Sequence, residues 1–149
     1  MIVTYAIKNR KKMMTTKQYL SQYKRMMKEC RCLDIEIEEL WNQLTSTTSS
    51  SDGMPKGTVT DRQTKLHAIM ADKVQVKRQK KKEAEELMAE ILETIDQVTD
   101  PIYRQLLFER YIQDREWVVI AEDLKYESEE YVRGKLHGKA LNEVSFIMG

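Results

Sequence analysis

The strongest constraint on the fold is a series of apolar residues that recur at alternating spacings of three and four. This series spans three full heptad repeats, which is the pattern of a helix that packs along one face. A second series of similar periodicity lies further along the chain. The two series comprise Tyr23, Met26, Cys30, Leu33, Ile37, Leu40 and Leu44, and then Ala84, Leu87, Ile91, Ile95 and Val98. They predict two long amphipathic helices.

The segment between the two series, residues 45–60, is dominated by Ser, Thr, Gly and Pro and predicts a flexible linker. The second helix should run from Asp61 to about Val98, where its apolar periodicity ends. Two amphipathic helices joined by such a linker fold back most simply as an antiparallel hairpin. We therefore predict a coiled-coil-like hairpin over residues 15–98. The same apolar faces also allow self-association, so we expect a homo-oligomer.

Residues 1–14 are expected to be a disordered leader. Alternatively, the protein starts at Met13 or Met14, because Thr15 or Thr16 can cap the helix that follows. The chain of 149 residues has only 5 Gly and 2 Pro, and 33% of its residues are charged. This composition is typical of long helices with few turns. It predicts an all-α protein, and the length suits one domain or one domain with an extension.

Basic residues gather on both predicted hairpin helices. Folding the chain back about the centre of the linker would set one group opposite the other, at a cost of only about a few tenths of a kcal/mol per exposed pair. Such a belt is a candidate surface for DNA phosphates, with a solvated helix face as the alternative. The two groups are Lys24, Arg25, Lys28 and Arg31, and Lys77, Arg78, Lys80, Lys81 and Lys82. We predict phosphate contacts by Lys77, Arg78, Lys80 and Lys81.

Several function classes find no support in the sequence. The balance of 25 Lys+Arg against 24 Asp+Glu gives no global argument for nucleic acid. Cys30 and Cys32 do not face each other on a helix, and His67 and His137 lie far from them, so we expect neither a disulfide nor a metal site. A phosphate loop and a nucleophile elbow are both absent, and we expect no enzyme activity and no cofactor.

We also expect a cytoplasmic protein without a membrane anchor. The apolar start from Met1 to Ile7 is followed by a basic run instead of a cleavage site. No stretch approaches the length of about 18 apolar residues that a membrane-spanning helix needs.

The C-terminal part, residues 99–149, predicts three helices over 101–112, 117–124 and 128–147, the first capped by Asp100. The last two helices are joined by a tight turn. The segment from Trp117 to Leu136 has the pattern of a DNA-binding helix-turn-helix. An ordinary helical hairpin is the alternative. Their facing apolar residues are Ile120, Ala121 and Leu124 on the first helix, and Val132, Leu136 and Ala140 on the second.

The turn itself makes two specific predictions. Ser128 should cap the second helix, with Glu129 and Glu130 placed favourably at its positive end. Lys125 should adopt the left-handed backbone conformation, which is uncommon for a residue that is not Gly, Asn or Asp.

The second helix of this motif supplies the candidate DNA contacts. Its first turns can reach base edges, where Arg bonds guanine and Glu accepts from cytosine; helix-end electrostatics is the alternative role of the two glutamates. Gly134 and Gly138 each cost about 1 kcal/mol relative to Ala inside a helix, which a close approach of DNA or another helix would explain. The predicted base contacts are Ser128, Glu129, Glu130 and Arg133, and the predicted phosphate contacts are Lys125, Lys135 and Lys139.

Several short sequence motifs occur in the same order as in a known family, and the resemblance covers almost the whole chain. They are Thr16 to Leu20, the Ser/Thr linker, the run from Asp100 to Ile112, Trp117 to Ala121, and Leu136 to Leu141. The chain is similar to phage and prophage regulators of the ArpU and RinA type, whose C-terminal part resembles the promoter-reading domain of sigma factors. The resemblance implies a late-gene transcription activator in infected bacteria. Its implied partners are double-stranded DNA and host RNA polymerase.

The turn departs from the usual form of that family, which has Gly or Asn after the first helix and a Ser soon after. Here Lys125 to Ser128 fill the turn, and the spacing from Ala121 to Leu136 is longer by about two residues. The register of the recognition helix therefore does not transfer from the family.

The charge of residues 99–149 leaves other interpretations open. From residue 101 onward there are seven basic and nine acidic groups, so acids such as Glu122, Asp123 or Glu143 are candidates for a protein partner. One alternative function is a small-terminase-like protein that recognises phage DNA for packaging. Another is a structural coiled-coil adaptor.

Overall fold

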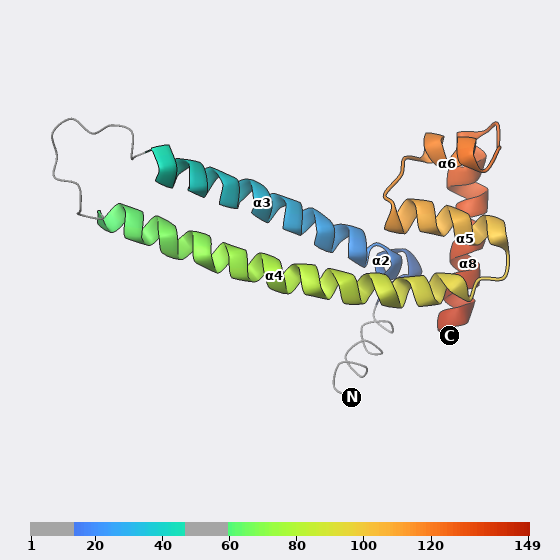
Figure 1. The fold of residues 1–149 in the computed structure, drawn as a ribbon. Coiled ribbons are helices and arrows are strands. Elements are labelled where there is room, and N and C mark those ends of the chain that lie inside the picture. Colours follow the sequence, from blue (N-terminus) through green and yellow to red (C-terminus); the bar gives the residue numbers. More distant parts are fainter. Residues whose placement is uncertain (1–13, 47–59) are drawn as a thin grey trace. The chain divides into compact units, whose positions relative to one another are not determined.

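The computed structural model describes residues 14–46 and 60–149, and all regular structure in these two ranges is helical (Figure 1). Residues 1–13 of the predicted leader, and most of the predicted linker, lie outside the described residues. The elements are α2 (Thr16–Leu20), α3 (Gln22–Ser46), α4 (Asp61–Asp96), α5 (Pro101–Leu107), η1 (Phe108–Ile112), α6 (Trp117–Asp123), α7 (Glu129–Tyr131), η2 (Val132–Leu136) and α8 (His137–Met148). The predicted all-α fold with a long helical hairpin is confirmed.

The helices begin where the sequence places capping residues. Thr15 forms a capping box with Gln18, in which each side chain bonds the backbone N–H of the other. Asp100 accepts a hydrogen bond of 2.8 Å from the backbone of Ile102, and Pro101 occupies the first helical position. The first predicted helix is interrupted at Ser21, whose hydroxyl donates to the carbonyl of Lys17 at 2.7 Å. This bond competes with the helical ladder at the α2–α3 junction.

The chain forms two compact units, and the first described here is the hairpin Met26–Glu83. Of its α3 residues from position 28 onward, only members of the predicted heptad series are shielded from solvent. Cys30 and Leu44 are buried, and Leu33, Ile37 and Leu40 are half-buried. The heptad periodicity therefore marks the packed face of α3 in this unit.

The antiparallel direction of the hairpin is set by three ion pairs between α3 and α4. Lys80 lies 2.6 Å from Glu29, Lys77 pairs with Asp34, and Lys73 lies 2.8 Å from Glu36. The paired positions move in opposite directions along the two helices.

These pairs change the charge pattern predicted for the belt. Lys77 and Lys80 were expected to face basic residues of the first helix, but each meets a carboxylate. Both lysines are half-buried beside the seam, with side chains about one-third exposed (33% and 32%). Arg78, Lys81 and Lys82 point to solvent. The belt is thus divided into paired seam lysines and exposed cations.

The described residues of the other unit are 14–25 and those from Ala84 onward. Its core draws on α2, the end of α4, and α5, η1, α6, η2 and α8, because none of these elements can bury an apolar face alone. The buried core residues are Tyr19, Leu20, Ile91, Ile95, Val98, Leu106, Leu107, Tyr111, Ile120, Ala121, Val132, Leu136, Ala140 and Val144. The core of the C-terminal helices therefore extends across the predicted boundary at residues 98 and 99.

Helix α2 is tied to this core by polar contacts as well as by packing. The Tyr19 hydroxyl donates to Glu90 at 3.2 Å and is hydrogen bonded to the Thr94 hydroxyl at 3.1 Å. Burial is the main cause that raises the pKa of Tyr19 to about 12, so this side chain remains a neutral hydrogen-bond donor.

We expect Leu20→Ala to lower the free energy of unfolding of this unit by about 2–5 kcal/mol, because Leu20 is fully buried in α2. The measurement is denaturation followed by Trp117 fluorescence in a Trp41→Phe background, which removes the second of the two tryptophans. Ile35→Ala, at a position 68% exposed, is the control and should change the result by less than about 0.5 kcal/mol. An unchanged Trp117 transition in Leu20→Ala would show that α2 does not belong to this core.

Candidate nucleic-acid interface

Helix α6 ends in a turn that reverses the chain within a few residues. The N–H of Tyr126 donates to the carbonyl of Ala121 at 2.9 Å, and that of Lys125 donates to Glu122 at 3.1 Å. These two bonds form a Schellman motif, in which the residue after the helix is left-handed and usually Gly. Lys125 occupies that position with a φ of 62°, which confirms the sequence prediction.

The second helix of the motif starts at Ser128, as predicted. The Ser128 hydroxyl accepts a hydrogen bond of 3.2 Å from the N–H of Tyr131. Glu129 and Glu130 lie in the first turn of α7, where carboxylates stabilise the positive helix end. Because its hydroxyl oxygen caps the helix, Ser128 has a structural role in addition to its predicted base contact.

The two helices cross through the predicted apolar residues. Ile120, Val132 and Ala140 are fully buried, and Leu136 is 5% exposed. Ala121 is 4% exposed and also carries the carbonyl that closes the turn. The helix-turn-helix geometry is therefore built from short side chains at the crossing and a tight backbone turn.

The helix that follows Ser128 is not uniformly α-helical. Residues 132–136 form the π-helical turn η2, which contains one residue more than an α-helical turn would at that place. Gly134 lies within η2, and Gly138 lies four residues after Gly134. A Cβ built at either glycine meets nothing within 4 Å. The described part of the chain thus contains no close helix contact that would explain these two glycines.

The outward face of this helix carries most of the predicted DNA contacts. Glu130 and Arg133 are exposed, and Arg133 lies 3.8 Å from the half-buried Glu129 one turn earlier. Lys135 and Lys139 are exposed further along, and Lys125 is exposed in the turn. The predicted base and phosphate contacts of the C-terminal unit therefore come from one continuous segment.

Tyr131 is a candidate contact that the sequence reasoning did not include. It is 39% exposed on the same face as Gly134, and its ring stacks on Tyr126 at a centroid distance of 5.8 Å. Apolar ring atoms at this position can contact a thymine methyl group. An aromatic residue at an outward position of the helix is the signal that would have identified it.

On the hairpin unit, the predicted phosphate contacts fall into two classes. Arg78 and Lys81 are exposed. Lys77 and Lys80 are engaged with Asp34 and Glu29, and the ion pair with Glu29 raises the pKa of Lys80. A phosphate would have to compete with a carboxylate for these two lysines.

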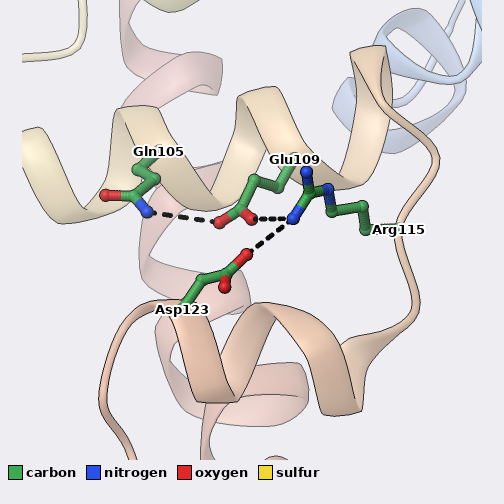
Figure 2. A network of polar contacts seen from close by, with 4 residues as sticks. All are labelled: Gln105, Glu109, Arg115 and Asp123. Atoms are coloured by element: carbon green, nitrogen blue, oxygen red, sulfur yellow. Dashed lines mark hydrogen bonds and ion pairs between the residues drawn. The ribbon is translucent and has the colours of Figure 1, made fainter.

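A polar network around the buried Glu109 joins α6 to η1 (Figure 2). One guanidinium nitrogen of Arg115 lies 2.8 Å from Asp123 and 3.4 Å from Glu109. The Gln105 amide donates to Glu109 at 3.4 Å. Glu109 is 4% exposed, and burial together with the nearby Asp123 raises its pKa to about 7. This network holds the first helix of the motif against the helix before it.

A second buried contact joins η1 to α8. The Tyr111 hydroxyl and the Nε2 atom of His137 are hydrogen bonded at 2.6 Å, and the Trp117 ring lies 4.7 Å from the His137 ring between centroids. Burial, with the positive charges of Lys17 and Arg110, lowers the pKa of His137 to about 4. His137 is therefore a neutral packing residue of the core.

The three acids that are candidates for contacts with a protein partner divide into two that make internal contacts and one that does not. Asp123 belongs to the Arg115 network, and Glu143 accepts hydrogen bonds of 2.9 Å from both the backbone and the hydroxyl of Thr99. Glu122 is exposed. Of these three carboxylates, Glu122 is the one whose side chain has no role in the contacts of this site.

Neither a metal centre nor a membrane span is found in the described ranges 14–46 and 60–149. There, no three or more His, Cys, Asp or Glu side chains are arranged to hold a metal ion. Cys30 is buried, Cys32 is exposed, and both are free thiols. No helix in these ranges combines the length and the apolarity that a membrane crossing needs.

Comparisons with known proteins add no relative. No protein-family model matches the chain, and no curated protein or solved structure matches it either.

We expect Lys125→Gly to raise the free energy of unfolding by about 0.5–1 kcal/mol, because Gly adopts a positive φ without the steric cost of a Cβ. Lys125→Ala is the matched control, since it removes the same charge and keeps the strained backbone. Chemical denaturation measured on both variants separates strain from charge. A Lys125→Gly protein no more stable than Lys125→Ala would contradict the strain at this turn.

The shifted pKa values of Glu109 and His137 predict opposing pH dependences. Folding raises the pKa of Glu109 from 4.5 to about 7, so folded protein retains a proton there and stability falls as the pH rises between these values. Folding lowers the pKa of His137 from 6.5 to about 4, so stability rises with pH over that range. Between pH 5 and 6.5 the two contributions offset each other.

Glu109→Gln removes the contribution to stability that falls with rising pH and leaves that of His137, which rises with pH. We expect the stability of this variant, relative to the unchanged protein, to increase by about 1 kcal/mol or more from pH 5 to pH 7. Denaturation curves of both proteins at these two pH values measure the difference. A difference that stays constant with pH would show that Glu109 titrates normally.

Proposed function

We propose that the protein is a phage-type transcription regulator that binds DNA sequence-specifically and activates late genes. The observation that carries the proposal is the helix-turn-helix of α6 to α8, with a rigid Schellman turn and a solvent-facing second helix. A helix that enters the major groove needs this short, rigid connection to its supporting helix.

Base recognition is assigned to the first turns of the second helix. Arg133 is 54% exposed by side chain and carries a fork of N–H donors that matches guanine O6 and N7. Its guanidinium lies 3.8 Å from the carboxylate of Glu129, one turn earlier in the same helix. This segment presents donors, acceptors and a ring edge to one groove.

Phosphate contacts are assigned to Lys125 in the turn and to Lys135 and Lys139 beyond it. All three are exposed. Between Val132 and Leu141 the helix contains three basic residues and no acid, so its second half attracts the DNA backbone. Arg78 and Lys81 of the hairpin are the further candidates that lie free of the seam ion pairs.

The formal charge of the C-terminal helices indicates that a second surface also contacts the DNA. Residues 101–149 hold seven basic and nine acidic groups, which is a weak electrostatic footprint for a DNA-binding domain. The hairpin cations, a second subunit, or host RNA polymerase would supply the missing attraction. In this proposal the protein acts in the bacterial cytoplasm as a homo-oligomer.

The proposal is tested by selecting bound fragments from phage and host DNA and measuring affinity for the selected site and for scrambled DNA. We expect Arg133→Ala to reduce the preference for the selected site by about 1–3 kcal/mol. Lys135→Ala with Lys139→Ala should weaken both DNAs similarly and lower the salt dependence by about two counterions. Lys17→Ala, an exposed charge outside this face, is the control.

Three outcomes contradict parts of the proposal. An unchanged preference in Arg133→Ala refutes the recognition-face assignment. Equal affinity for all DNA refutes sequence-specific regulation, and the absence of salt-dependent binding favours a structural adaptor. A ring of about eight or more subunits that binds packaging-site DNA favours the small-terminase-like function.

A further inference from the structure

Helix α4 carries a second heptad series, distinct from the seam that packs on α3. Its positions alternate in spacing between three and four, which aligns them along one face of the helix. The series is Arg62, Lys65, Ile69, Asp72, Val76, Gln79 and Glu83. Ile69 and Val76 at its centre are each 45% exposed, and of the seven only Glu83 is partly shielded. We call these seven residues the outer stripe.

The hairpin that presents this stripe has a small core. Among the described residues of Met26–Glu83, Cys30 and Leu44 alone fall below one-tenth exposure. Three neighbouring seam positions of α4 hold Lys73, Lys77 and Lys80, which pair with carboxylates at the edge of the seam. Two helices with so few buried apolar groups gain most of their stability from additional packing.

We propose that a second copy of this chain packs its outer stripe antiparallel against the first. A two-fold axis between Ile69 and Val76 places Ile69 of each copy against Val76 of the other. The same axis brings Arg62 at one end close to Glu83 of the second copy, and the pair occurs twice. Apolar contacts on both sides of the axis and opposite charges at both ends make the surface self-complementary, with the two Asp72 side chains beside the axis itself.

The charges on the stripe select the antiparallel arrangement over the parallel one. In a parallel pair, Arg62 would meet Arg62 and Glu83 would meet Glu83, whereas in the antiparallel pair each meets the other. Asp72 lies beside the axis and meets its own copy in either arrangement, so it does not distinguish them. Like charges that face each other across a helix interface destabilise it, whereas opposite charges set its orientation. The acids on the stripe also make it a poor surface for nucleic acid.

This inference does not depend on the proposed function, since it concerns the hairpin unit alone. It identifies the surface through which the expected homo-oligomer forms. The mass of the full chain, measured without DNA, therefore tests it separately from any DNA-binding result.

The first experiment measures mass by light scattering and sedimentation over a range of protein concentrations. We expect a dimer or larger assembly, and we expect Ile69→Glu with Val76→Glu to raise its dissociation constant by more than about tenfold. Ile35→Glu, at a position on α3 that is 68% exposed and outside the stripe, is the matched control and should leave the mass unchanged. Circular dichroism verifies that each variant remains helical.

The second experiment tests orientation by exchanging charges. Arg62→Glu alone should weaken the assembly, and adding Glu83→Arg should restore it, because the exchanged pair is again opposite in charge. In a parallel pair the double change would not restore it. A monomer at every concentration, an assembly indifferent to the Ile69 and Val76 changes, or a failure of the charge exchange would each overturn the proposal.

Discussion

The buried hydrogen bond between Tyr111 and His137 is the contact on which the helix-turn-helix depends. At 2.6 Å it joins η1 to the helix that carries the proposed DNA contacts, and Trp117 at the start of α6 packs on the same imidazole. Three elements of the motif thus meet at one ring. Because burial raises the pKa of Tyr111 to about 12 and lowers that of His137 to about 4, both groups stay neutral and the bond persists at physiological pH.

The π-helical turns follow from the same packing. η1 carries Tyr111 and η2 ends at Leu136, directly before His137. A π-helical turn inserts one residue and rotates everything after it relative to an unbroken α-helix. η1 contains one partner of the shared contact and η2 directly precedes the other, and η2 lies within the long interval from Ala121 to Leu136. The outward face beyond η2 therefore differs from the one that a continuous helical wheel would assign.

Much of the fold could be predicted because local chemistry decides it. Thr15, Asp100 and Ser128 cap helices through bonds to residues two or three positions away, and Lys125 must turn left-handed to end α6. The heptad spacing likewise determined which residues of α3 face inward. These features need no information from distant parts of the chain.

The features that could not be predicted all depend on distant partners. The hydrogen bond between Tyr19 and Thr94 joins residues 75 positions apart. No periodicity of the sequence indicates that α2 belongs to the C-terminal core. Glu109 resembles any exposed helical acid until Arg115 and Asp123 enclose it (Figure 2). Charge patterning suggested a continuous basic belt, but pairing of Lys77 and Lys80 depends on the side-chain reach across the seam.

The structure also changes the meaning of the acidic balance in residues 101–149. Glu109, Asp123 and Glu143 are occupied in internal contacts, and Asp114 lies 3.3 Å from Lys24. Asp123 and Asp114 each lie beside a cation, so their charge is compensated locally and contributes little repulsion toward an approaching phosphate. The remaining exposed charge along the second helix is ordered, with acids in its first turn and bases within and after η2. A groove-bound helix with this order would hold phosphates with its second half and read bases with its first, so a near-neutral domain can still bind DNA in a defined orientation.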